Sequence, residues 1–202
     1  MSMKLPVILG VGVIAAIGGY FYMQPPVVET TSATSAAVVS TASRADDYTP
    51  EQLAQMTPET LIDMQTQAFT AVVNAANDVS EASSLNERPD YISPAEWVML
   101  SSVASQKPNP DAELVRLVNL VRFNKQLELL QQTTDDSERK VLTEAVLTQL
   151  PKRIENKEMS VERAQSVQLQ LIEQLYTDPK DVRERAAQEA ERIGATFSIE
   201  QS

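Results

Sequence analysis

From residue 49 onward the chain repeats one short pattern that restricts its fold more than any other feature. A small polar residue is followed by proline and then by an acidic residue within two further positions. The pattern begins at Thr49, Thr57, Ser93, Asn109 and Asp178. A side-chain oxygen at an N-cap accepts a hydrogen bond from a free backbone N–H, proline suits the first helical position, and a carboxylate is stabilised at the positive helix end. Five helices are therefore predicted to begin at these residues, with capping-box spacing at Thr49–Gln52 and Ser93–Glu96.

Two further helices are predicted to start without proline, at Asp135/Asp136 and at Ser160. The paired carboxylates could in principle bind a hard cation or act as acid and base, but their place before a helix favours capping. Apolar residues at helical spacing follow over 110–131, 141–150 and 161–175.

The helix ends are predicted from proline, glycine and polar residues. Pro151 is expected to end the helix that contains Leu150, and Gly194 to end the last helix, over 179–193. A softer helix is predicted over 58–82. The expected fold class is all-α, either an irregular multi-helix bundle or an extended helical arm.

Residue types that are scarce or absent support this fold class and limit the chemistry. Four of the five glycines lie before residue 20, which argues against hairpin turns and against glycine-rich nucleotide loops. The chain has no Cys and no His, which excludes a disulfide, a zinc ribbon, a Cys nucleophile and a Ser-His-Asp triad. We therefore predict no catalytic residues, no metal site and no cofactor, and a protein that is not an enzyme.

The run Leu5–Met23 carries no charge, and it is long enough to cross a hydrocarbon core about 30 Å thick. Lys4 precedes it and the next charge is Glu29, so the positive-inside rule predicts a single-pass signal-anchor. The C-terminal domain would then be periplasmic, held at a bacterial inner membrane. The alternative is a cleaved signal peptide, but bulky residues follow the run where a small-x-small cleavage site is needed.

Residues 24–48 are rich in Pro, Ser, Thr and Ala and have no apolar periodicity. This composition predicts a disordered linker with an r.m.s. span of roughly 25–30 Å. The expected organisation is a transmembrane anchor over 1–23, the linker over 24–48, and a helical extracytoplasmic domain over 49–202.

The charge balance limits the partners. The chain has 17 basic and 28 acidic residues, a formal net charge of −11. A surface of this sign repels phosphate backbones, so no nucleic-acid partner is expected.

The densest group of polar and aromatic residues runs from Arg88 through Asp90 and Tyr91 to Trp97. Trp, Tyr and Arg are over-represented among binding hot spots, so these four residues are candidates for binding a protein client. The alternative, which we favour, is that Trp97 lies in the core and that Asp90 and Tyr91 lead into a capped helix.

Arg122 and Phe123 are further candidates for client binding, and they continue into Asn124 and Lys125 on an otherwise apolar helix. The four residues form a docking edge or, in the interpretation we favour, the solvated face of the helix with the aliphatic stems packed against it.

Six residues follow the order of a known signature: Arg88, Asp90, Tyr91, Ser93, Ala95 and Glu96. This order resembles the lipase foldase signature of an Arg, Phe-Asp-Tyr, Ser-Ala and Gly-Glu, with Pro89 in place of Phe, no counterpart of the Gly, and shorter spacing. The anchor, low-complexity linker and helical body are also similar to the organisation of that family, whose members are membrane-tethered steric chaperones. The resemblance implies an accessory protein for a secreted lipase or phospholipase.

The favoured hypothesis is a non-enzymatic, membrane-anchored periplasmic chaperone that binds an exported client. A first alternative is a bitopic structural subunit of an envelope or secretion assembly, for which Ala15 and Gly19 would permit close approach of two membrane helices. A second alternative is an enzyme that uses paired carboxylates.

Overall fold

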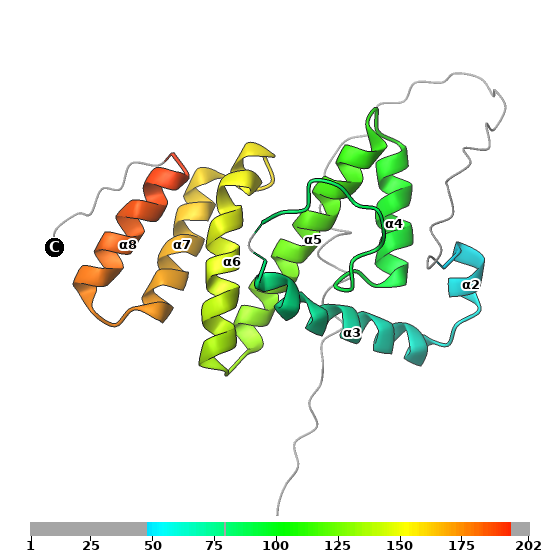
Figure 1. Ribbon diagram of the computed structural model, residues 1–202, viewed down its shortest axis with the longest axis horizontal. Helices are drawn as coiled ribbons and strands as arrows, with labels where there is room; N and C mark the ends of the chain where they lie inside the picture. Colours follow the sequence, from blue (N-terminus) through cyan, green and yellow to red (C-terminus); the bar gives the residue numbers. More distant parts are fainter. Residues whose placement is uncertain (1–47, 79, 195–202) are drawn as a thin grey trace, which may run out of the picture. The chain divides into compact units, whose positions relative to one another are not determined.

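The computed structural model describes residues 48–78 and 80–194. The described residues form seven helices and no strand, which confirms the all-α prediction (Figure 1). The helices are α2 (Pro50–Ala54), α3 (Pro58–Ala76), α4 (Pro94–Ser105), α5 (Pro110–Gln132), α6 (Asp136–Glu155), α7 (Val161–Leu175) and α8 (Pro179–Arg192).

The predicted anchor Leu5–Met23 and linker residues 24–47 lie outside the described residues. Within 48–78 and 80–194, no helix combines the length and the apolar character that a membrane crossing requires.

All seven predicted helix starts are confirmed. The N-cap side chains each accept a hydrogen bond from a backbone N–H of the following turn: Thr49, Thr57, Ser93, Asn109, Asp135, Ser160 and Asp178. Both capping boxes also form, since Thr49 N donates to Gln52 Oε1 at 2.7 Å and Ser93 N donates to Glu96 Oε2 at 2.8 Å. Local side-chain chemistry therefore sets where each helix begins.

Two predicted helix ends are wrong. The helix expected over 58–82 ends at Ala76, because Asp78 Oδ1 accepts hydrogen bonds from Ser80 N (3.1 Å) and Ser80 Oγ (2.5 Å) and so stabilises a turn. Pro151 does not end α6, which continues to Glu155 with Leu150 and Arg153 fully buried on either side of the proline. The end of α8 beside Gly194, whose φ is +68°, agrees with the prediction.

Pro151 leaves the carbonyl of Leu147 without its helical N–H donor, because proline has no backbone N–H. Replacing Pro151 by alanine is therefore expected to raise the free energy of unfolding, by about 1–3 kcal/mol. Urea unfolding followed by circular dichroism measures this change. Pro179→Ala is the matched control, because Pro179 occupies the first turn of α8, where the missing N–H costs nothing. A destabilised Pro151→Ala chain would contradict the argument.

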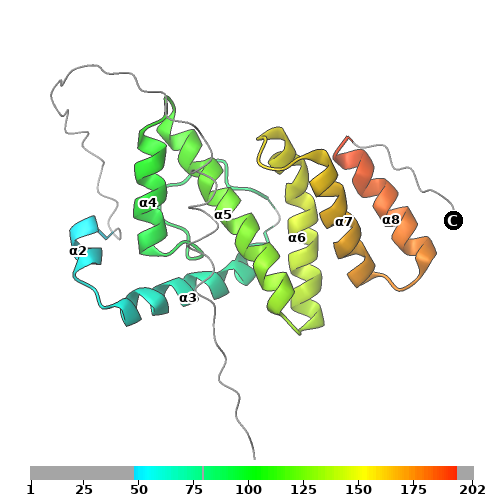
Figure 2. The ribbon, with the colours of Figure 1, turned by 180° about the vertical axis from the view of Figure 1, so that it is seen from behind.

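Helices pack mainly against their neighbours in sequence. The pairs α4–α5, α5–α6, α6–α7 and α7–α8 are in contact, while α3 packs on both α5 and α6. In both views α6, α7 and α8 lie side by side (Figures 1 and 2).

The buried apolar side chains form two clusters that meet along α5. One joins α4 to the first half of α5 and includes Ile92, Trp97 and Val118. The other joins the second half of α5 to α6, α7 and α8 and includes Phe123 and Leu147. Because α5 contributes to both clusters, it is the central element of the described body.

Candidate functional site

The connection between α3 and α4, residues 77–93, contains Arg88, Asp90 and Tyr91 and lies against α5. We call it the α3–α4 segment. Three α5 residues at three-residue spacing hold it and form a polar stripe: Asn119, Arg122 and Lys125.

Each member of the polar stripe bonds to backbone of the α3–α4 segment. Asn119 exchanges two hydrogen bonds with Ala82, donating from Nδ2 to its carbonyl at 2.9 Å and accepting from its N–H at 3.2 Å. Arg122 Nη2 donates to the carbonyl of Asp78 at 3.2 Å, and Lys125 Nζ donates to that of Tyr91 at 2.8 Å. The stripe thereby satisfies backbone groups for which helix or sheet partners are absent in this segment.

Lys125 also forms a buried ion pair with Glu96 of α4. The Nζ–Oε2 distance is 2.8 Å, and Glu96 Oε2 is the same atom that accepts the capping-box bond from Ser93. Burial lowers the pKa of Lys125 from its ordinary value, while the Glu96 carboxylate opposes that shift. One carboxylate thus caps α4, neutralises a cation on α5 and fixes the two helices to each other.

Tyr91 lies beside Arg122, and its phenol is largely buried. Burial raises the pKa of the Tyr91 phenol above its ordinary value of 10.0, against the opposing charge and hydrogen bond of Arg122. A raised folded-state pKa means that the folded chain favours the neutral phenol, so this contribution to stability is complete below about pH 10 and is lost as the pH rises through the raised value.

The Tyr91 phenol therefore gives a pH-dependent prediction. Wild type should lose more stability above pH 10 than the Tyr91→Phe variant, which lacks the ionisable group. The difference in ultraviolet absorbance between the two chains during alkaline titration reports the ionisation of Tyr91. An ionisation at or below pH 10 would show that the phenol is not protected by burial.

Arg153, in the last turn of α6, is 0% exposed. It pairs with Glu81 of the α3–α4 segment, and its Nη1 lies 2.8 Å from Glu158 Oε2 in an ion pair without hydrogen-bond geometry. The guanidinium carbon is 5.9 Å from the centroid of the Phe123 ring, within cation–π range. Arg153 therefore connects α6, α5, the α3–α4 segment and the turn after α6.

Glu158 connects this group of ion pairs to the first half of α5. Arg116 pairs with Glu158 and, at 2.7 Å, with Glu113. Its hydrogen bond to Glu113 raises the pKa of Arg116 although partial burial opposes the shift. Alternating acidic and basic groups thus run from Glu113 to Glu81.

The structure places the residues predicted to bind a client in unequal settings. Trp97 and Phe123 are core residues, in line with the interpretation favoured for Trp97. Arg88 is half-buried and donates to the Ile92 carbonyl, and Tyr91 lies beside Arg122, whereas Asp90 is exposed.

The expectation that Arg122 and Lys125 belong to a solvated helix face is wrong. They are 3% and 2% exposed, because the α3–α4 segment and α4 cover that side of α5. Asn119 and Arg153, which hold the α3–α4 segment in place, were not predicted from the sequence. Only the three-residue spacing of the polar stripe gave a signal, and such a stripe is interpreted as solvent-facing when its cover is unknown.

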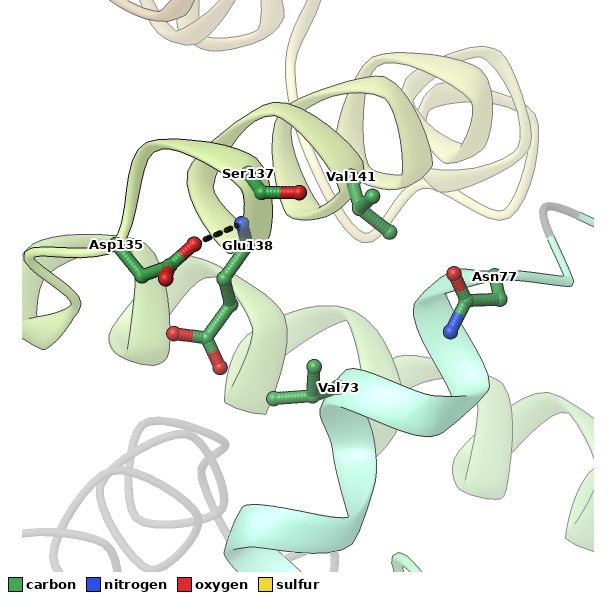
Figure 3. A pocket seen from close by; sticks show the side chains of 6 residues that line it. All are labelled: Val73, Asn77, Asp135, Ser137, Glu138 and Val141. Atoms are coloured by element: carbon green, nitrogen blue, oxygen red, sulfur yellow. Dashed lines mark hydrogen bonds between the residues drawn. The ribbon is translucent and has the colours of Figure 1, made fainter.

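A shallow groove of about 450 Å³ opens between the end of α3 and the start of α6 (Figure 3). Val73 of α3 and Asn77, the residue that follows α3, line one side, and Ser137, Glu138 and Val141 line it from α6 together with the N-cap Asp135. The two valines supply apolar surface. Asp135 Oδ1 accepts a hydrogen bond from Glu138 N at 2.8 Å, so the positive start of α6 already has an acidic partner.

Every charged residue in the segment that includes α2 and α3 is acidic. Residues 48–87 include six Asp or Glu and no Lys or Arg. The α3 helix also exposes Ile62, at 61%, the most exposed large hydrophobic residue in the described part of the chain. Apolar surface and uncompensated negative charge therefore occur together on α3.

The described residues offer this groove and helix surface for binding, and their interior ion pairs are used in packing. Across 48–78 and 80–194, Asp and Glu do not gather in any group of three suited to a metal ion. Comparisons with protein-family models, with curated proteins and with solved structures give no match for this chain.

Proposed function

We propose that this chain is a non-enzymatic, membrane-anchored helper that binds an exported client protein outside the cytoplasm. The observation that carries the proposal is apolar exposure on an acidic helical body: Ile62 is 61% exposed, Met99 43% and Leu169 38%. Such side chains cover apolar surface of an incompletely folded client, while net negative charge keeps the helper itself soluble.

The sequence supplies the rest of the proposal. Leu5–Met23 is the proposed anchor in a bacterial inner membrane, and residues 24–48 are the tether that keeps the helical body near the site of export. The resemblance of residues 88–96 to the lipase foldase signature favours a secreted lipase or phospholipase as the client class. The helper would act by mass action, binding the client and requiring no cofactor.

A refolding assay tests this function. Full-length chain is reconstituted into phosphatidylcholine nanodiscs, and a urea-unfolded secreted bacterial lipase is diluted into the sample. Recovered lipase activity is expected to exceed that with empty nanodiscs and to rise with the amount of chain. No increase at any ratio of chain to lipase would reject the lipase-helper proposal.

The competing candidate is a bitopic structural subunit, and the Ala15/Gly19 spacing is the observation that favours it. It requires a partner within the membrane. Ala15→Leu and Gly19→Leu should then abolish cross-linking of the chain to a membrane protein, whereas the helper function requires only that the anchor be retained.

A further inference from the structure

We propose that the groove between α3 and α6, extended along α3 by Ile62 and Phe69, is the docking surface for a basic, amphipathic segment of a partner protein. The inference rests on the proposed function and deepens it, because it assigns a surface and a chemistry to the client.

The first step is the continuity of the apolar surface. Ile62, Phe69 and Val73 stand at positions i, i+7 and i+11 of α3, within about 40° of one another around the helix axis. Ile62 is exposed, while Phe69 and Val73 are half-buried. Val73 also lines the groove, so these three apolar side chains run from the groove about 16 Å along one side of α3, with Gln65 and Thr66 between Ile62 and Phe69.

The second step is the charge beside that surface. Glu59 and Asp63 are exposed within one turn of Ile62, and Asp135 and Glu138 line the groove. The two basic residues nearest in sequence, Arg139 and Lys140, are not among the lining residues, and Arg139 is paired with Asp136 at 2.9 Å. An apolar floor with acidic edges is complementary to a helix that has one apolar and one basic face.

The third step selects among occupants. A second copy of this chain would bring the same net charge of −11, and its own α2 and α3 contain no basic residue. An anionic ligand at the start of α6 would meet the Asp135 and Glu138 carboxylates. A surface of about three helical turns matches a short amphipathic segment whose apolar residues recur at i, i+3 or i+4, and i+7.

The test measures binding of a labelled Leu/Lys amphipathic peptide of about 18 residues by fluorescence anisotropy. Full-length chain in phosphatidylcholine nanodiscs is the receptor, and binding to empty nanodiscs is subtracted. A Leu/Glu peptide with the same pattern tests the sign of the charge. A Ser/Lys peptide with the same charge tests the need for the apolar face.

Two substitutions probe the surface from opposite sides: Ile62→Lys on α3 and Ser137→Lys on α6. Ser166→Lys on α7 and Ala187→Lys on α8 are the controls, since each places a lysine at an exposed site outside the groove. The first pair should weaken binding of the Leu/Lys peptide about tenfold or more, and the second pair less than about twofold. Circular dichroism confirms that each variant keeps its helix content.

The docking proposal is overturned if the wild-type chain does not bind the Leu/Lys peptide, if the Ser/Lys or Leu/Glu peptide binds equally well, or if both pairs of variants weaken binding alike. The lipase assay separates this failure from failure of the proposed function. Wild type and both surface variants promoting refolding equally would reject the surface and keep the helper function. Peptide binding that maps to the groove, without any refolding effect, would keep the surface and reject the lipase as client.

Discussion

Replacing Arg153 by alanine is expected to lower the free energy of unfolding by about 3–5 kcal/mol. The truncation leaves the Glu81 carboxylate, with a side-chain exposure of 18%, without its cation, and leaves Glu158, with a side-chain exposure of 7%, paired with Arg116 alone. It also removes the guanidinium above the Phe123 ring. Urea unfolding of the full-length chain, followed by circular dichroism, measures the loss.

The residue next to Arg153 provides the control. Lys152 is exposed and pairs with Glu155 at 2.9 Å on the surface of α6, so Lys152→Ala should change stability by less than about 0.5 kcal/mol. Arg153→Lys should restore little, because one ammonium group does not reproduce the planar fork that serves two carboxylates. If Arg153→Ala is as mild as Lys152→Ala, the interior charge network does not stabilise the fold.

Lys125→Met is expected to cost a similar amount, about 3–5 kcal/mol, because it removes the two Nζ hydrogen bonds and leaves the Tyr91 carbonyl and the Glu96 carboxylate without this donor. Methionine fills much of the space of the lysine stem, so the loss reports the missing amine more than a cavity. Trp97, the only tryptophan of the chain, lies in the same region of the core and reports unfolding by its fluorescence.

A second substitution separates charge from packing. Glu96→Gln removes the unpaired charge in the Lys125→Met background and keeps a side-chain oxygen for the capping-box bond from Ser93. The double variant should therefore be more stable than Lys125→Met alone. If adding Glu96→Gln destabilises the chain further, the buried charge is not the cause of the loss.

The pH dependence of the same pair has a defined sign. The pKa of Lys125 is lowered from 10.5 in the folded chain, so the unfolded chain binds the proton more readily between the lowered value and 10.5. This group therefore adds stability as the pH rises through that window. Relative to Lys125→Met, wild type should gain stability there, opposite in sign to the effect of Tyr91.

The helix starts could be predicted because each is specified by residues adjacent in sequence. Ser93 and Glu96, for example, satisfy each other's backbone within a single turn. The ends of α3 and α6 could not, because tertiary contacts act there in addition to local ones such as the turn between Asp78 and Ser80. Asp78 is held by Arg122, which lies 44 positions away, and the turn beyond Pro151 is fixed by the burial of Arg153.

The same distinction explains the candidate site. Arg122 and Lys125 have the composition and spacing of a solvent-facing stripe, and only the α3–α4 segment makes that side of α5 interior. The groove joins Val73 to Val141 across two helices that are not consecutive, so no local pattern predicts it. The acidic character of residues 48–87, by contrast, is visible in the sequence.

Because the last helices pack one after another along the chain, the free energy of local opening is expected to differ from helix to helix. The main helix contacts of α8 are with α7, reinforced by the bond from Gln168 Nε2 to the Glu189 carbonyl at 2.9 Å and by the pair of Arg185 with Glu144 of α6. In such an array the terminal unit detaches at the lowest free energy, so the amide hydrogens of α8 exchange with solvent ahead of those in α5 and α6. Detachment of α8 leaves the contact between α3 and α6 in place, so local opening of α8 does not interrupt binding at the groove.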